Sequence, residues 1–198
     1  MKKFTILVGK SASGKDSIRE QILKISNYKS IISTTSRPKR QYEQEGVDYY
    51  FISTEEFLDL IEEGAFAEYR VYNANDTNDK DVVWYYGTSK KNKYDENSRY
   101  VGILDLDGAR NFVDFYGADN CRVCYIFCTD EEREQRAKNG RRGKDFRQKE
   151  WNRRLLDDNE KFSLRRFVEM FRDVETEVFD NIQPNDYKEI AKDIISRS

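Results

Sequence analysis

The chain has no histidine, and this absence limits the chemistry that it can perform. Ser-His-Asp and Cys-His catalysis are both excluded, because each uses an imidazole as its general base. A zinc site with mixed cysteine and histidine ligands is excluded for the same reason. The chemistry must therefore depend on lysine, arginine, carboxylates, hydroxyls, backbone amides or a bound metal ion.

Long hydrophobic runs are missing as well. The apolar run Phe4–Val8, which follows Met1-Lys2-Lys3, is too short for the hydrophobic region of a signal peptide. No stretch approaches the length of a transmembrane helix. We therefore expect a cytoplasmic protein with no membrane partner.

The chain also lacks a charge excess, because 35 basic and 37 acidic residues leave a net charge of −2. Such a balance produces no global attraction for nucleic acid, so we expect no nucleic-acid partner. Cysteine is scarce and confined to one segment, at Cys121, Cys124 and Cys128. That segment is rich in β-branched and aromatic residues, which predicts a strand with small buried cysteines rather than a metal cluster.

A length of 198 residues suffices for one α/β domain with small excursions. Short apolar runs alternate with segments of helical periodicity, which predicts a parallel sheet covered by helices on both faces. The expected strands are Phe4–Val8, 30–33, 49–52, 101–106, 121–128 and 178–179, and the expected helices are about 16–25, 53–64, 108–116, 131–138, 147–170 and 187–195.

The stretch 34–87 interrupts this alternation, as an inserted subdomain would. Two strands, at about 66–71 and 82–86, are expected to form a hairpin, and the polar segment 73–81 is expected to be its loop.

The first strand leads directly into Gly9-Lys-Ser-Ala-Ser-Gly-Lys15, which fits the pattern G-x-x-x-x-G-K. Glycines allow successive N–H groups to point at phosphate oxygens, the following helix contributes its N-terminal end, and Lys15 supplies a cation. A plain glycine-rich turn is the alternative. The residues expected to bind ATP phosphates are Gly9, Ser11, Ala12, Ser13, Gly14, Lys15, Asp16 and Ser17.

Asp16 stands where this motif usually has serine or threonine, and Ser17 follows it. Asp16 either points into solvent or helps to hold a magnesium ion. The pair Asp16-Ser17 resembles the version of the loop in which nucleotide kinases displace the hydroxyl by one residue. Ser17 is therefore the candidate hydroxyl ligand of Mg²⁺.

A second motif occupies the inserted region. The run from Ser33 to Phe51 resembles the guanylate kinase signature S-x-T-T-R/S-R-x-x-R-x-x-E-x-x-G-x-D-Y-x-F without a gap. The resemblance continues through 66–68, 85–88 and 103–107, and with the phosphate loop it covers most of residues 4–160. It implies an α/β P-loop fold of three layers, with an inserted mostly-β nucleotide-acceptor subdomain and a helical lid.

The resemblance implies transfer of the γ-phosphoryl group of ATP to GMP, or to dGMP. Arg37 and Arg40 can bind the acceptor phosphate as planar donors. The Glu68 carboxylate can accept from guanine N1–H and N2–H, while the Ser33 and Thr88 hydroxyls can donate to O6. The residues implied to bind GMP are Ser33, Arg37, Arg40, Glu43, Tyr49, Glu68, Tyr86, Thr88 and Asp107.

Asp105 is implied to hold Mg²⁺ together with Ser17, partly through water, although acids at strand ends are also common as helix caps. The implied division is a single kinase domain over 1–198. Its core covers about 1–33, 88–135 and 155–198, its GMP-binding subdomain covers 34–87, and its lid covers 136–154.

The segment 133–154 is rich in lysine and arginine. It can be a solvated helix pair, a nucleic-acid patch or a lid that closes over the transferring phosphate. The resemblance favours the lid, and it implies a catalytic set of Lys15, Arg136, Arg141, Arg142 and Arg154.

Three further features depart from the family: Tyr42 replaces a usual glycine, 73–81 is an insertion, and Gly108-Ala109 follows Asp107. Two alternatives to a GMP kinase stay open. The chain could be a phosphopeptide-binding module that has lost catalysis, or a P-loop kinase for another nucleoside monophosphate. The expected oligomeric state is a monomer or a homodimer.

Overall fold

The computed structural model describes residues 2–75, 80–139 and 146–197. The chain forms two compact units. The first unit combines Met1–Lys29 with Ser98–Ser198, and the second is Ser30–Asn97. The second unit contains the whole stretch 34–87 for which the sequence predicts an insertion.

The first unit is built on a five-stranded sheet with the order β2-β7-β1-β8-β9. Its strands β7, β1, β8 and β9 pair in parallel. The expected parallel sheet is therefore confirmed. The strands are β1 (Phe4–Val8), β2 (Lys29–Ser30), β7 (Tyr100–Ile103), β8 (Cys121–Phe127) and β9 (Glu175–Asp180).

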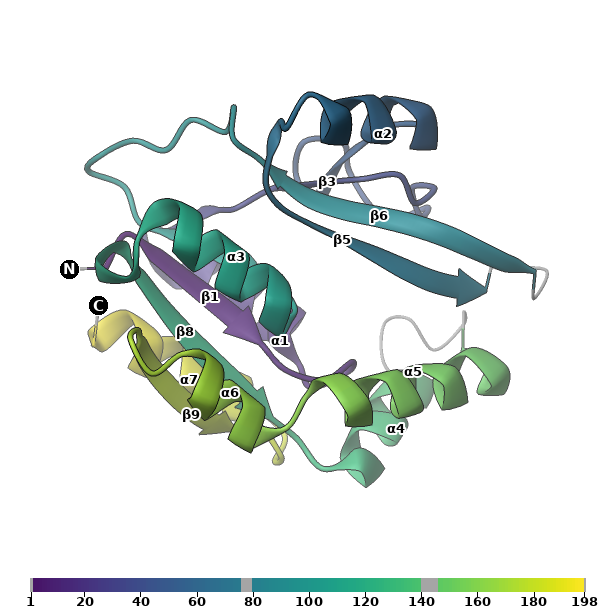
Figure 1. The fold of residues 1–198 in the computed structure, drawn as a ribbon. Coiled ribbons are helices and arrows are strands. Elements are labelled where there is room, and N and C mark those ends of the chain that lie inside the picture. Colours follow the sequence, from purple (N-terminus) through teal and green to yellow (C-terminus); the bar gives the residue numbers. More distant parts are fainter. Residues whose placement is uncertain (1, 76–79, 140–145, 198) are drawn as a thin grey trace. The chain divides into compact units, whose positions relative to one another are not determined.

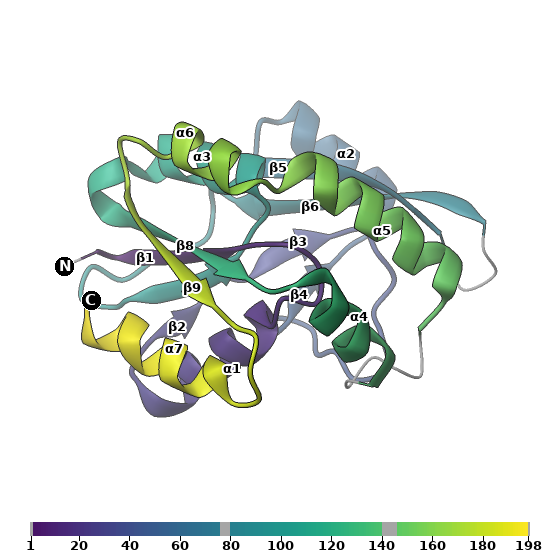
Figure 2. The same cartoon turned by 90° about the horizontal axis from the view of Figure 1, so that it is seen from below.

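Helices cover both faces of this sheet. In Figure 2, α1 (Lys15–Ile25) and α7 (Asp186–Ser196) lie on one side of the strands, while α3 (Leu106–Tyr116) and α6 (Leu164–Met170) lie on the other. Each face is sealed by apolar side chains. Leu7 and Ile18 belong to a buried cluster on the α1 face, and Phe4 packs edge-on against Phe112 on the α3 face. Because helices cover both faces of the sheet, β1 is buried along its whole length.

All three cysteines are buried and free, as expected. Cys121 and Cys124 belong to β8 in the interior of the sheet, and Cys128 follows the strand. Burial raises the pKa of the Cys124 thiol to about 12, so it stays protonated and behaves as a small hydrophobic side chain. The residues that the structure describes hold no His/Cys/Asp/Glu group that could bind a metal ion by itself.

A helical region follows β8. It comprises α4 (Asp130–Asn139), α5 (Gln148–Lys161) and α6. Before β8, the short 3₁₀ turn η1 (Ala118–Asn120) follows α3. The single helix expected over 147–170 is wrong, because the chain leaves helical geometry at Phe162, where φ is −109° and ψ is 96°. Ser163 then starts α6 by accepting a hydrogen bond from the Arg166 amide at 3.1 Å.

The second unit contains a four-stranded sheet with the order β4-β3-β6-β5 and the helix α2 (Thr54–Glu62). The α2 helix begins with the expected capping box of Ser53 and Glu56. Figure 1 shows α2 beside β5 and β6. The buried Phe57 ring of this helix stacks on Phe66 of β5, with ring centroids 4.4 Å apart. The strands are β3 (Ser33–Thr35), β4 (Tyr49–Phe51), β5 (Phe66–Asn75) and β6 (Asp81–Ser89).

Three expected boundaries need correction. The strand 30–33 is wrong, because β2 ends at Ser30 in one sheet and β3 begins at Ser33 in the other. The strand 101–106 ends early, because Asp105 already caps α3. The loop 73–81 is too long, because the β5–β6 pairing continues to Asn75 and Asp81. Residues 76–79 of that expected loop lie outside the described part of the chain.

No helix within 2–75, 80–139 and 146–197 has the length and apolar character that crossing a membrane requires.

Candidate active site

The loop between β1 and α1 has the backbone geometry of a phosphate cradle. Gly9 and Gly14 have φ angles of 146° and 94°, which side chains rarely adopt. A Cβ atom on Gly9 would lie 2.5 Å from the Ile126 carbonyl oxygen, and one on Gly14 would lie 2.2 Å from Asn181 Nδ2. Both glycines are therefore required for this tight turn, as the G-x-x-x-x-G-K pattern predicts.

The Lys15 side chain lies over the same loop. Its Nζ donates to the Gly9 and Lys10 carbonyl oxygens at 2.6 and 2.8 Å and approaches Ser13 Oγ at 3.4 Å. Lys15 is also the first residue of α1, whose N-terminal end carries partial positive charge. The loop thus combines a cation with a helix end, which is the arrangement that binds phosphate groups.

Two residues from distant parts of the chain bind the carbonyl oxygen of Ser13. Asn181, buried directly after β9, donates from Nδ2 at 2.7 Å, and Arg136 of α4 donates from Nη1 at 3.4 Å. Arg136 also donates to the Ile182 carbonyl oxygen at 3.2 Å. The expected lid residue Arg136 thus lies at the phosphate loop. Asn181 was missed by sequence reasoning, although a polar residue directly after a strand was the signal available.

Arg133 and Asp158 were missed as well. Arg133 of α4 is fully buried, donates from Nε to the Ser11 carbonyl oxygen at 2.7 Å, and forms ion pairs with Asp158 and Asp130. Asp158 of α5 accepts hydrogen bonds from the Ser11 amide and hydroxyl at 2.9 and 3.3 Å. Burial raises the pKa of the Asp158 carboxyl, although Arg133 and Lys15 act to lower it.

The candidate metal ligands differ in their surroundings. Ser17 is exposed in the first turn of α1, directly after the loop. Asp16 lies in the same turn and is half-buried. Asp105 accepts a hydrogen bond from the Gly108 amide at 2.7 Å through Oδ1 and so caps α3. Mg²⁺ bound to a nucleotide needs only one or two protein oxygens, since phosphates and waters supply the others. The residues present fit that requirement.

Asp107, expected to bind the acceptor nucleoside, belongs to the first unit. It lies in the first turn of α3, and its Oδ1 accepts a hydrogen bond from Arg166 Nη2 of α6 at 2.6 Å.

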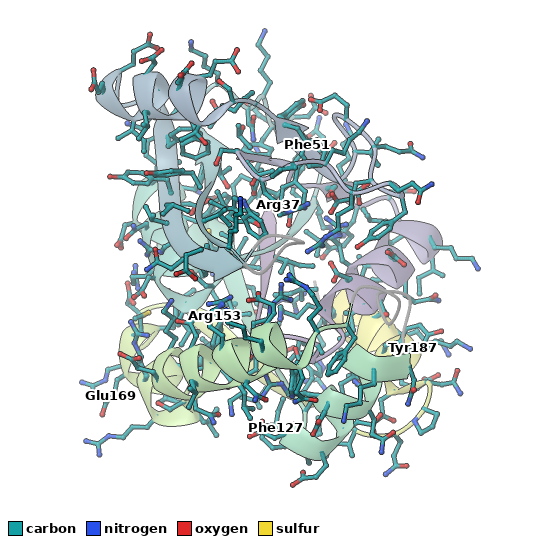
Figure 3. The ribbon with its side chains drawn as sticks, turned by 90° about the vertical axis from the view of Figure 1, so that its right-hand side faces the viewer. Arg37, Phe51, Phe127, Arg153, Glu169 and Tyr187 are labelled. Carbon is teal, nitrogen blue, oxygen red and sulfur yellow. The ribbon has the colours of Figure 1, made fainter. Side chains whose placement is uncertain are left out.

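The second unit places an arginine among aromatic rings and a carboxylate. Arg37 is buried, and its Nη2 donates to Glu43 at 2.7 Å while its Nε donates to the Tyr86 hydroxyl at 3.1 Å. The guanidinium carbon lies 5.6 Å from the centre of the Tyr49 ring and 5.8 Å from that of Phe51, which Figure 3 labels beside Arg37. Aromatic faces and one carboxylate therefore orient this cation.

Glu43 joins both expected phosphate-binding arginines. Its Oε2 accepts from the Arg40 amide at 2.8 Å, and its Oε1 lies 3.7 Å from Arg40 Nη1. Burial acts to raise the pKa of Glu43, but the hydrogen bonds from Arg37 and the Arg40 amide outweigh it and lower the pKa. The unexpected Tyr42 places its hydroxyl 3.4 Å from Arg40 Nη1. Glu43 thus acts here on the arginines, which the sequence did not reveal.

Three further expected acceptor residues form a hydrogen-bonded line. Thr88 Oγ1 donates to Glu68 Oε1 at 2.6 Å and lies 3.3 Å from Ser33 Oγ. They come from β6, β5 and β3, which are neighbours in the four-stranded sheet. Only 4% of Glu68 is exposed, so this carboxylate is held away from bulk water. Its position offers a hydrogen-bond acceptor beside two hydroxyl groups.

The expected lid arginines are described only in part. Arg154 of α5 donates from Nε to Glu150 at 2.7 Å, and its neighbour Arg153, labelled in Figure 3, donates to the same carboxylate. Burial acts to raise the pKa of Glu150, but its hydrogen bonds with Arg153 and Arg154 outweigh it and lower the pKa. Arg141 and Arg142 lie outside the described residues.

Comparison with known proteins points to one family. The family model described as guanylate kinase matches residues 1–186. A guanylate kinase of Mesomycoplasma hyopneumoniae (strain 7448) is 36% identical over 121 residues, which is 59% of this chain and 57% of the relative. A guanylate kinase of Wolinella succinogenes is 34% identical over 135 residues, which is 66% of this chain and 59% of the relative.

Each of these alignments therefore spans less than two thirds of the relative's own length. Among solved structures, guanylate kinase from Anaplasma phagocytophilum superimposes with a TM-score of 0.63 at 23% sequence identity. That superposition covers 99% of this chain and 84% of the other. At this level of identity the superposition supports the fold and no finer property.

Proposed function

The chain belongs to the guanylate kinase family, and we propose that it transfers the γ-phosphoryl group of ATP to GMP, forming ADP and GDP. The observation that carries this proposal is the buried line of Ser33, Thr88 and Glu68 in the second unit. A carboxylate beside two hydroxyls matches guanine, which presents N–H donors at N1 and N2 beside the O6 acceptor. Adenine has an acceptor at N1 and no amino group at C2, so it would offer the Glu68 carboxylate neither of the two guanine donors, and such a site rejects it strongly.

The acceptor phosphate is assigned to Arg37 and Arg40, with Tyr49 and Tyr86 as hydroxyl donors. The planar arginine side chains suit a dianionic phosphate, and Glu43 holds Arg37 in place from the side. We assign the ATP phosphates to the loop at 9–15 together with the side chain of Lys15.

The proposed reaction is an in-line displacement. An oxygen of the GMP phosphate forms a bond to the γ-phosphorus as the bond from that phosphorus to the β–γ bridging oxygen breaks. Positioning and positive charge around the equatorial oxygens supply the rate enhancement, so no histidine base is needed. Lys15, Arg136, Arg141, Arg142 and Arg154 are the proposed sources of that charge.

Magnesium is proposed as the accompanying ion. Ser17 and Asp105, with Asp16 near by in α1, would hold it, in part through water. When bound, Mg²⁺ would neutralise charge on the ATP phosphates.

The two alternatives receive no specific support. A phosphopeptide-binding module does not need the complete phosphate loop that Gly9, Gly14 and Lys15 form. The acceptor line around Glu68 is suited to guanine rather than to another base. A preference between GMP and dGMP, the division into core, GMP-binding subdomain and lid, the monomeric or dimeric state and the cytoplasmic location all stay predictions.

The test is a transfer assay with ATP and Mg²⁺ across GMP, dGMP, AMP, CMP and UMP. We expect GMP to be the preferred acceptor. Glu68→Gln should lower kcat/KM for GMP about 100-fold, because the amide cannot accept from both guanine donors, and should leave AMP turnover almost unchanged.

Two controls accompany this assay. Glu62→Gln, on the exposed end of α2, should keep the activity of the unchanged protein. Lys15→Met should lower kcat about 10³-fold without unfolding the chain, since it removes a positive charge that would stabilise the transferring phosphate. Transfer to none of the five nucleotides, or equal turnover of GMP by the Lys15 variant, would rule out the proposal.

A further inference from the structure

Arg133 and Asp158 form a buried ion pair behind the phosphate loop. Arg133 belongs to α4 and is fully buried, while 5% of Asp158 on α5 is exposed. Moving two charges out of water costs free energy that their attraction often fails to recover. Stability alone is therefore a weak reason for this pair, and its contacts indicate what else it does.

Both backbone groups of Ser11, the third residue of the loop, are bound by the pair. The Ser11 amide donates to Asp158 Oδ2 at 2.9 Å, and the Ser11 carbonyl oxygen accepts from Arg133 Nε at 2.7 Å. The Ser11 hydroxyl adds a contact to Asp158 Oδ1 at 3.3 Å. Because the direction of loop amides decides how well they bind phosphate, fixing Ser11 fixes part of the anion site.

The neighbouring residue Lys10 is bound by the same two helices. Its Nζ lies 3.3 Å from Asp130 of α4 and donates to Asn159 of α5. Asp130 in turn pairs with Arg133, whose guanidinium carbon lies 5.6 Å from the centre of the Trp151 ring. The first half of the loop is thus connected to α4 and α5 through several side chains rather than one.

We propose that Arg133 and Asp158 are positioning residues for ATP: they clamp Ser11 and hold the loop in the shape that binds phosphate. This inference rests on the proposed function only for the identity of the nucleotide bound at the loop. The opposite role is that the Asp158 carboxylate competes with phosphate for the Ser11 amide. The two roles predict changes of opposite sign when the pair is removed.

The decisive variant combines Arg133→Met with Asp158→Leu. It removes one charge of each sign, so the net charge near the loop is unchanged and any change in ATP affinity reports on loop position. Replacing a buried pair by apolar side chains of similar size usually preserves stability. We expect the Kd and KM for ATP to rise about tenfold, the effect of losing one hydrogen bond to a charged group. The KM for GMP should not change.

Two further proteins make the result specific. Arg133→Lys keeps the charge but loses the planar fork that reaches Ser11 and Asp158 together, so its Kd for ATP should rise as well. This variant decides the matter if the double variant does not fold. The control combines Arg110→Met with Asp173→Ala, which removes an ion pair of the same unit between α3 and the segment that joins α6 to β9, and its Kd for ATP should match that of the unchanged protein.

The Kd for ATP is measured by calorimetry without any acceptor, so it does not depend on GMP turnover. If the unchanged protein binds ATP but transfers nothing to GMP, the proposed function fails while the clamp is still judged by these Kd values. A rise in Kd for both Arg133 variants, with the control unchanged, supports the clamp. An unchanged Kd in both, tighter binding in the double variant, or no ATP binding by the unchanged protein overturns it.

Discussion

Glu43 shows how a residue of the motif can act on other residues of the motif. Glu43 is buried and holds Arg37 and the Arg40 amide, while the two arginines are the proposed ligands of the acceptor phosphate. The sequence motif contains all three residues, but it assigns Glu43 to the substrate. In the structure its two oxygens are engaged by protein donors, so we propose that Glu43 acts on the substrate through the two arginines rather than by direct contact.

This buried pair predicts a specific pH dependence of stability. The folded state holds the pKa of Glu43 below its ordinary 4.5. The ionised carboxylate therefore stabilises the fold fully above pH 4.5, and that stabilisation is lost as the pH falls through the lower, folded-state pKa. Glu43→Gln should lower the free energy of unfolding by about 3 kcal/mol at neutral pH, because Arg37 stays buried without its charge partner.

Urea unfolding at about pH 7 and about pH 3.5 measures this effect. The unchanged protein should lose more stability on acidification than the Glu43 variant does. Glu62→Gln, at an exposed position of α2, serves as the control and should follow the unchanged protein. Equal acid sensitivity of all three proteins would show that the Glu43 ion pair contributes nothing.

Arg133 illustrates what residue-level pattern reading cannot see. In the sequence it is one of many basic residues in 133–154, with no feature that distinguishes it from a solvated arginine. Only its burial and its hydrogen bond to the Ser11 carbonyl oxygen separate it from exposed Lys138 in the same helix. Such selection depends on which face of α4 packs inward.

At the scale of single elements, local sequence signals predict where helices and strands begin, but they do not predict where a long helix is interrupted. The β1 strand, the Gly64 stop and the capping box of α2 follow from local rules. The break between α5 and α6 at Phe162 does not, because charged residues are frequent on both sides of it. Phe162 is buried, and Ser163 is available to cap the next helix, so packing favours two helices over one.

Asp105 offers an element-scale test, because its two roles respond differently to substitution. As the cap of α3 it accepts from the Gly108 amide, and asparagine caps helices about as well as aspartate. Asp105→Asn should therefore preserve the free energy of unfolding, while Asp105→Ala should lower it by about 1 kcal/mol. As a magnesium ligand, asparagine lacks the charge, so Asp105→Asn should raise the Mg²⁺ concentration for half-maximal activity about tenfold.

Thermal unfolding without nucleotide and a Mg²⁺ titration of activity separate these roles. Ser53→Ala, which removes the cap of α2, should cost about 1 kcal/mol of stability without altering the Mg²⁺ requirement. If Asp105→Asn leaves the titration unchanged, Asp105 is a helix cap and the proposed metal role is wrong.

At the scale of the whole molecule, the two proposed nucleotide sites draw on different units. The phosphate loop, Arg136 and the clamp at Ser11 belong to the first unit, and the line around Glu68 belongs to the second. The binding of each nucleotide should therefore leave a distinct pattern of protection. Asp107 is the one expected GMP ligand that belongs to the first unit.

Amide hydrogen exchange with one nucleotide at a time tests this division. ATP should slow exchange in the loop at 9–15 and in α4, while GMP should slow exchange within Ser30–Asn97. At a ligand concentration of about 100 times Kd, the protection should approach 2.7 kcal/mol for amides that exchange only from the unbound state. AMP serves as the control for GMP. Protection by GMP at 9–15 without protection in Ser30–Asn97 would contradict the assignment.

The sequence by itself determined the parallel α/β sheet, the phosphate loop and the family, because each is encoded by residues that are close together along the chain. A buried strand followed by G-x-x-x-x-G-K and a helix needs only adjacent residues, and the guanylate kinase signature occupies one continuous stretch from Ser33 to Phe51. These features depend on backbone geometry and spacing that are encoded within a few residues.

Tertiary structure alone decided which polar side chains from distant segments support the phosphate loop. Asp158 accepts a hydrogen bond from the Ser11 amide, and Asn181 donates one to the Ser13 carbonyl oxygen, although each pair is far apart along the chain. The periodicity of the sequence does not predict such contacts, because they arise when separate elements pack against one sheet and bury their polar groups together. Burial then makes each contact strong, since a buried donor or acceptor must find a partner in the protein.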